Sequence, residues 1–222
     1  MSGSVPAADE TRDDSRSVPV WLALLVLALL LAVMGVGGFA LRGALEHSSS
    51  PTSAVDLEIA KWEDSVKINS DDLEAHLSLG FAYQQAKRYD DAIAQYDFVI
   101  DRTPKDTAAL YNRGVALMAL GDDDGAEATW WQVLEIEPQH VLSAKSLGEL
   151  YADRGEYRSL VEAVRPVVEQ NDSAADLQYL MGLAYENLGR ADWAKIRYEL
   201  ALKYYPDMPE AKEGLKRLGV EQ

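Results

Sequence analysis

Apolar residues are distributed along the chain in two different ways. Ser17 to Leu41 form a run of 25 residues without a charged side chain, and about 20 apolar residues suffice to span a bilayer. Farther along, apolar residues recur at spacings of three and four, as at Leu79, Ala82 and Tyr83. This spacing places them on one face of an α-helix. The pattern therefore predicts an all-α protein: one apolar helix followed by an array of amphipathic helices.

The apolar run has two interpretations, an uncleaved membrane anchor and a cleaved signal peptide. Gly38-Phe39-Ala40 is a permissive cleavage site. However, the apolar core of a signal peptide covers only about 7–15 residues behind a basic leader, and here Arg12 and Arg16 are outnumbered by acidic residues. We therefore favour the anchor. The expected segments are a short tail at 1–17, a transmembrane helix at 18–41 and a flexible tether at 42–54.

The basic residues beside the run predict its orientation. Arg12 and Arg16 precede it and Arg42 follows it, and the more basic flank of a span usually stays in the cytoplasm. This predicts a single-pass protein whose C-terminal part lies outside the cytoplasm.

The remainder of the chain repeats itself without an insertion, with a period of about 34 residues. One column holds Gly80, Gly114, Gly148 and Gly182. Another holds Tyr83, Leu117, Tyr151 and Tyr185, and a third holds Ala92, Ala126, Leu160 and Ala194. Because glycine inside a helix costs up to about 1 kcal/mol, a glycine column indicates that two helices approach closely. The small residues of the third column indicate the same approach from the partner helix.

Turn residues divide each period into two helices. Gly121, Gly155 and Gly189 follow the first helix, where a left-handed cap is needed. Pro104, Pro138 and Pro206 follow the second, since proline cannot continue a helix. In the last, incomplete unit Lys216 replaces the glycine of the column.

These columns resemble the tetratricopeptide repeat (TPR) family, whose repeat of about 34 residues is a pair of antiparallel helices. The resemblance covers Leu73 to Met208 and implies a right-handed α-α superhelix. Polar terminal helices keep such arrays soluble. The expected units are repeats at 73–106, 107–140, 141–174 and 175–208, with capping helices at 55–72 and 209–222.

Charge and composition limit the classes of partner and of chemistry that suit this chain. The chain has 37 acidic and 21 basic residues, a net charge of −16, and no cysteine. An acidic surface argues against nucleic acid as the partner, because nucleic acid demands a basic one. The absence of cysteine excludes disulfides and thiolate chemistry.

Catalytic motifs are missing. The three histidines, His47, His76 and His140, are not at metal-ligand spacing, and neither HExxH nor GxSxG occurs. We therefore expect no enzyme activity, no cofactor and no metal site.

The resemblance implies a concave groove lined by the first helix of each repeat. The positions expected to bind a partner are Leu77, Phe81, Tyr111, Asn112, Val115, Met118, Lys145, Glu149, Tyr179 and Leu183. An apolar stripe with acids around it suits a protein or peptide of apolar and basic character; alternatively, the stripe only packs or is covered by the chain itself. The carboxylate clamp by which relatives hold chaperone tails is absent, since Asn112 is its one matching residue.

Two tryptophans, Trp131 and Trp193, are predicted on the opposite, convex face, whereas Trp130 is not. Trp130 shares a column with Trp62, Tyr96 and Tyr198 and is expected to pack. Its neighbour Trp131 stands in a column that is charged in the other units. Trp131 either covers part of a neighbouring surface or, like Trp193, is a convex-face contact point for a partner.

Together these features predict a membrane-anchored, non-catalytic scaffold or assembly factor. The architecture resembles bacterial inner-membrane TPR proteins, such as the TPR subunits of cytochrome c maturation and the ancillary subunits of the protein-export channel. Architecture alone does not choose between those pathways. The alternative is a structural bridge between membrane complexes that uses convex-face contacts and no peptide groove.

Overall fold

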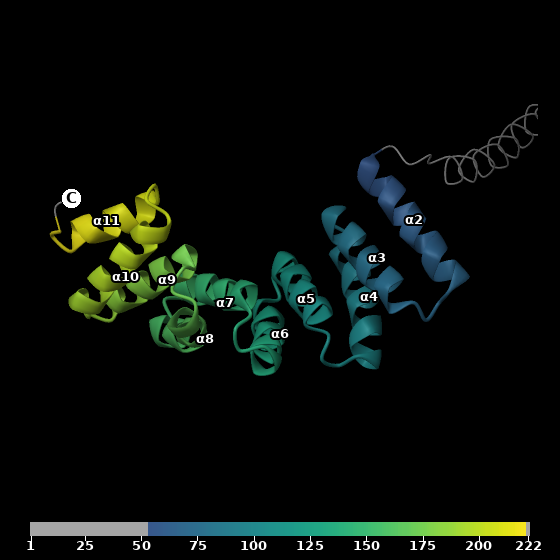
Figure 1. Cartoon of the computed structure of the whole chain (residues 1–222). Helices are drawn as coiled ribbons and strands as arrows, with labels where there is room; N and C mark the ends of the chain where they lie inside the picture. Colours follow the sequence, from purple (N-terminus) through teal and green to yellow (C-terminus); the bar gives the residue numbers. More distant parts are fainter. Residues whose placement is uncertain (1–52, 221–222) are drawn as a thin grey trace, which may run out of the picture. The chain divides into compact units, whose positions relative to one another are not determined.

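A computed structural model describes residues 53–220, and every element within that range is an α-helix (Figure 1). The expected tail at 1–17 and transmembrane helix at 18–41 lie outside the described residues, as does most of the tether. The first helices are α3 (Leu73–Gln85), α5 (Thr107–Leu120), α7 (Val141–Arg154) and α9 (Ala175–Asn187). The second helices are α4 (Tyr89–Arg102), α6 (Asp123–Ile136), α8 (Tyr157–Gln170) and α10 (Ala191–Tyr204). The terminal helices are α2 (Ala54–Ile68) and α11 (Pro209–Arg217).

The helices form a solenoid, as the repeat predicts. Each of α3, α5, α7, α9 and α11 begins one full repeat period after the one before it, with no irregular interval. Each helix packs against the next one along the chain, and α7 also contacts α9. Among the described residues, no helix has both the length and the apolarity needed to cross a membrane.

Polar side chains cap the start of three of the four first helices, whereas Ala174 before α9 makes no side-chain cap. The side chains of Asp72, Asp106 and His140 each accept a hydrogen bond from the backbone N–H three residues farther on. Such a bond satisfies one of the N–H groups that the first turn of a helix leaves free. At α2 the cap is reciprocal, because Ser53 and Asp56 each bond the other's backbone. Thus α2 begins at Ala54, one residue before the expected boundary.

The predicted left-handed turns are present. Gly121, Gly155 and Gly189 have φ values of 82°, 70° and 72°. In the first repeat the same column is occupied by Lys87, which adopts a φ of 60°. Because a side chain is unfavourable in this region, Lys87 is a strained position that the other repeats avoid.

The glycine column permits helices to approach closely, as expected. A β-carbon on Gly80, Gly114 or Gly182 would lie within 2.6 Å of the ring of Tyr96, Trp130 or Tyr198. In the last helix the expectation about Lys216 was incomplete. Gly214, two residues earlier, lies against the other side of the Tyr198 ring. The last helix therefore keeps a glycine-to-aromatic contact, but two residues before the position that the glycine column predicts.

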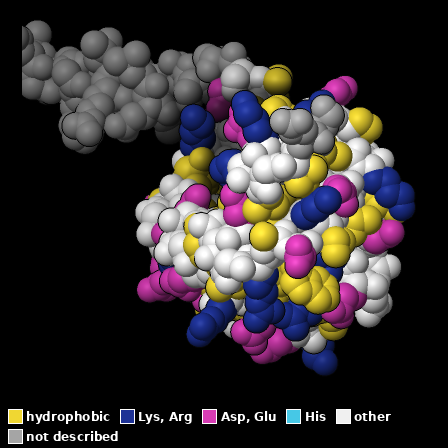
Figure 2. Space-filling view, turned by 90° about the vertical axis from the view of Figure 1, so that its left-hand side faces the viewer, with side chains coloured by type: hydrophobic (Ala, Val, Ile, Leu, Met, Phe, Trp, Pro, Cys, Tyr) yellow, Lys and Arg dark blue, Asp and Glu magenta, His cyan; other side chains and the backbone are white. Residues whose placement is uncertain are grey.

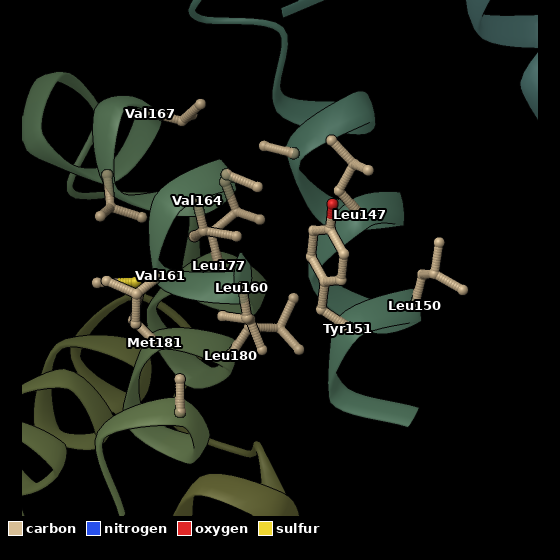
Figure 3. Close-up of a cluster of buried hydrophobic side chains, with 14 of the residues drawn as sticks. Leu147, Leu150, Tyr151, Leu160, Val161, Val164, Val167, Leu177, Leu180 and Met181 are labelled. Atoms are coloured by element: carbon tan, nitrogen blue, oxygen red, sulfur yellow. The ribbon is translucent and has the colours of Figure 1, made fainter. Parts of the chain in front are cut away.

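The buried side chains form two clusters. The N-terminal cluster contains Ile59, Leu79, Ala82, Tyr83, Ala92 and Tyr96. The C-terminal cluster extends from Leu117 to Leu215 and includes side chains from α5 to α11. Figure 3 shows its centre, where Leu147 and Tyr151 of α7, Leu160 and Val164 of α8, and Leu177 and Met181 of α9 converge. The two ends of the array therefore rest on cores of very different size.

Candidate functional site

The first helices line two pockets of different composition. The N-terminal pocket has a volume of about 490 Å³. Its walls are the apolar side chains Val55, Trp62, Leu77, Phe81 and Ala82, with Glu58, Gln85 and Asn112 at polar positions. Phe81 leaves 49% of its surface exposed, so this pocket offers aromatic, apolar surface to a partner.

The C-terminal pocket is formed by α7, α9 and the start of α11. It has a volume of about 410 Å³. Its apolar walls are Tyr179, Leu180, Leu183, Tyr205 and Met208. Its polar lining is Lys145, Glu149, Asp153, Asp176 and Glu210.

Charges in the C-terminal pocket are only partly paired. The ammonium of Lys145 lies 2.6 Å from Asp176 and 3.8 Å from Glu149, and the hydrogen bond to Asp176 raises the pKa of Lys145. Within the described part of the chain, Asp153 and Glu210 form no ion pair. Burial raises the pKa of the Glu149 carboxyl, against the effect of Lys145. The pocket therefore holds more negative charge than its own lysine neutralises.

The predicted groove residues divide into three groups. Leu77, Phe81 and Asn112 line the N-terminal pocket. Lys145, Glu149, Tyr179 and Leu183 line the C-terminal pocket. Tyr111, Val115 and Met118 of α5 line neither of these pockets and pack, half-buried, against the C-terminal cluster. The ring of Tyr111 lies 5.4 Å from that of His140. The three predicted residues in the middle of the expected groove therefore belong to neither pocket.

Residues of the terminal helices and loops complete both pockets, and reasoning from the four repeats alone misses them. Trp62, for which the columns predict only packing, lines the N-terminal pocket. Glu210 stands one repeat period after Asp176, so extending the groove column into α11 finds it. Tyr205 and Met208 lie in the loop before α11, where no groove column of the repeat falls.

The two adjacent tryptophans differ in environment. Trp130 is buried with 2% exposure, as predicted. Trp131 is half-buried rather than solvated, because its Nε1 donates to the hydroxyl of Tyr151 at 2.7 Å and its ring packs against the C-terminal cluster. Residues in the column of Trp131 therefore contact the next helix pair: Glu63, in the same column, accepts a hydrogen bond from the hydroxyl of Tyr83. Trp131 also lines a small pocket of about 120 Å³ with Pro138 and Pro166.

Trp193 lies on α10 and is exposed, with 54% of its surface accessible, as is Ile196 one turn later at 49%. Figure 2 views the end of the array that holds α10 and α11. Apolar, acidic and basic side chains are interspersed on this face, so it carries no patch of a single charge.

Metal chemistry finds no support in the described residues. Within 53–220 no three His, Asp or Glu side chains are grouped in a way that could hold a metal ion.

The family models that match this chain are models of a repeat of this kind. A model of the family described as "Tetratricopeptide repeat" matches residues 69–140, and a second of the same description matches residues 175–208. The curated relatives include DnaJ homolog subfamily C member 3 of Bos taurus, 26% identical over 119 residues that make up 54% of this chain and 23% of the relative. FK506-binding protein-like of Rattus norvegicus is 43% identical over 54 residues, 24% of this chain and 16% of the relative. The chain thus spans less than a quarter of the length of these relatives.

Solved structures share the fold. MamA superposes with a TM-score of 0.61 at 20% identity, covering 70% of this chain and 96% of that one. YrrB superposes with a TM-score of 0.60 at 18% identity, covering 73% of this chain and 84% of that one. The constant period, the paired helices, the glycine contacts and both family matches agree. The chain belongs to the tetratricopeptide repeat family.

Proposed function

We propose that this protein is a non-catalytic interaction scaffold that binds a segment of a partner protein along its row of first helices. The partner segment has apolar and basic character. The single observation that carries the proposal is the open N-terminal pocket, in which Trp62, Leu77 and Phe81 present apolar surface to solvent.

Binding at this pocket has a direct physical cause. Removing apolar surface from water contributes about 25 cal/mol per Å², and aromatic side chains in pockets dominate the energetics of many interfaces. A protein of the same fold, YrrB, is described as having an unusual peptide-binding site, which supports the proposal at the level of the fold.

The test is selection from a library of displayed random peptides by the full chain, with Phe81→Ser as the comparison. Enrichment of peptides with a shared apolar residue, lost in Phe81→Ser, is the expected result. Asp101→Asn, an exposed substitution on α4, serves as the control and should select the same peptides. Peptides that bind Phe81→Ser as well as the wild type would refute the pocket as the binding site.

A structural bridge without a peptide groove is the second candidate, and Trp193 favours it. Trp193 and Ile196 are exposed one turn apart on α10, so they offer a contact away from the row of first helices. Partners lost by Trp193→Ala but retained by Phe81→Ser would support this alternative. The membrane span at 18–41, the extracytoplasmic position in a bacterial inner membrane and a role in cytochrome c maturation or export stay predictions from the sequence.

A further inference from the structure

The two pockets differ in the chemistry that they offer a bound segment. In the N-terminal pocket the one lining carboxylate, Glu58, already accepts from the indole N–H of Trp62 and lies 3.6 Å from the ammonium of Lys61. The negative charge of Glu58 is therefore already compensated by Trp62 and Lys61. The remaining lining is mostly apolar, so this pocket suits an aliphatic or aromatic side chain.

The C-terminal pocket combines an apolar wall with unpaired negative charge. Tyr179, Leu183 and Tyr205 form the wall, and the rings of the two tyrosines can face a cation. Lys145 is the one basic side chain in the lining and is already held by Asp176. Asp153 and Glu210 have no such partner in the described structure. A second cation entering this cavity would meet both carboxylates and aromatic faces.

We propose that one extended segment of the partner occupies both pockets, placing an apolar side chain in the N-terminal pocket and a lysine or arginine in the C-terminal pocket. This inference rests on the proposed function and adds the order of the two contacts. An arginine suits the second pocket well, because its methylene stem can lie on Leu183 while the guanidinium reaches the carboxylates.

The positions of the pockets predict the minimum separation of the two side chains. The first pocket is centred on α3 and the second lies between α7 and α9. Packed helices lie about 8–10 Å apart, and α5 and α7 contact each other less closely than α7 and α9 do, so the span is at least roughly 25 Å. An extended chain covers at most about 3.3–3.6 Å per residue, so roughly seven or eight residues must separate the two anchors. A shorter segment reaches one pocket only and loses the gain of simultaneous contact.

The experiment uses synthetic peptides with a Leu-Phe pair, a Gly/Ser spacer and an Arg-Arg pair, acetylated and amidated at their ends. Spacers of two and nine residues are compared, and citrulline replaces arginine in a neutral, nearly isosteric control. Isothermal titration calorimetry measures Kd for the full chain in one detergent buffer, with detergent-only blanks. The test variant is Asp153→Asn with Glu210→Gln. The control variant, Asp101→Asn with Glu169→Gln, makes the same charge change at exposed positions of α4 and α8.

We expect the long peptide to bind about tenfold more tightly than the short peptide or the citrulline peptide. The Asp153/Glu210 variant should abolish that advantage, whereas the Asp101/Glu169 variant should retain it. Equal Kd values for short and long spacers, or an unchanged advantage in the Asp153/Glu210 variant, would overturn the inference.

Failure of the proposed function gives a different result. If long-peptide binding depends on Phe81 but not on Asp153 and Glu210, the groove is retained as the binding site, and the assignment of the acidic C-terminal pocket to a basic side chain is refuted. If no peptide binds, or Phe81→Ser leaves all Kd values unchanged, the groove falls as well. Heat released on diluting the protein alone, abolished by Phe81→Ser, would identify a second copy as the occupant and would also overturn the inference.

Discussion

The two ends of the array are built on one repeat and differ in core and surface. At the N-terminal end, α2, α3 and α4 bury a cluster of six residues beneath a largely apolar pocket. At the C-terminal end, α7 to α11 share the larger cluster beneath a pocket with four carboxylates. Both ends keep the same glycine-to-aromatic contact, Gly80 to Tyr96 and Gly182 to Tyr198.

The difference shows which positions the repeat constrains. Columns that join the two helices of a repeat are nearly the same at both ends, whereas the groove positions and the joints to the neighbouring helices vary. The stability of a solenoid is roughly a sum of repeat and interface contributions. We therefore expect the N-terminal end to open first and the C-terminal end to resist longest.

Removing the buried tyrosine at each end tests this comparison with the largest effect. Tyr198→Ala should cost about 4 kcal/mol of unfolding free energy and Tyr96→Ala about 3 kcal/mol. Tyr198 is enclosed by two glycines, Gly182 and Gly214, and its hydroxyl donates to the charged Glu186. Tyr96 has one such glycine and donates to the neutral Gln84.

Urea unfolding followed by circular dichroism gives the free energies, and hydrogen exchange with mass spectrometry locates the loss. Tyr96→Ala should raise exchange in α2 to α4 and leave α9 to α11 protected. Uniform exchange along the whole array in both variants would mean that the two ends unfold as one unit, contrary to the comparison.

Trp131 tests the joint between the second and third repeats. Its ring is half-buried and its indole N–H is a donor to the Tyr151 hydroxyl. Losing both contacts in Trp131→Ala should cost about 2 kcal/mol of unfolding free energy. Trp193 is exposed, so the matched change Trp193→Ala should have only the small effect typical of a surface substitution. Thermal melts of the two variants measure the difference, and equal costs would show that Trp131 is a surface residue after all.

Trp131 also shows where prediction from the sequence succeeds and where it stops. Features that recur in every period, such as the glycine column and the turn at Gly155, follow from local backbone and packing rules and were predictable. The N-cap role of His140 and the hydrogen bond from Trp131 to Tyr151 depend on single side chains meeting a particular neighbour, which periodicity does not report. Tyr205 completes the C-terminal pocket from an inter-helix loop for the same reason.

The ion pair between Arg217 and Glu186 makes the stability of the C-terminal end depend on pH. The hydrogen bonds from Arg217, and then from Tyr198, lower the pKa of Glu186. A carboxyl with a lowered folded-state pKa stabilises the fold above its unfolded value of about 4.5, and this contribution is lost as the pH falls through the folded-state pKa. Because Arg217 is half exposed, Glu186→Gln should cost only about 1 kcal/mol at neutral pH.

Unfolding of wild type and Glu186→Gln at pH 7, 5, 4 and 3 checks the sign. The difference between them should be full at pH 7 and 5 and shrink toward pH 3. Arg217→Gln should show a smaller loss with the same direction of pH dependence, because Tyr198 still donates to Glu186. A cost that stays constant down to pH 3 would assign the effect of Glu186→Gln to packing rather than to charge.

The smallest expected effect comes from replacing Lys87, a strained residue in the turn of the first repeat at the N-terminal end. Lys87 adopts a φ of 60° in the turn where the other repeats have glycine. A side chain there costs about 1–2 kcal/mol, against about 0.5–1 kcal/mol of extra chain entropy for glycine, so Lys87→Gly should stabilise the fold by about 0.5 kcal/mol. The reverse change, Gly121→Lys, has free space around the added β-carbon and should cost a similar amount. If both changes proved neutral in urea unfolding, this turn would not contribute to the difference between the two ends.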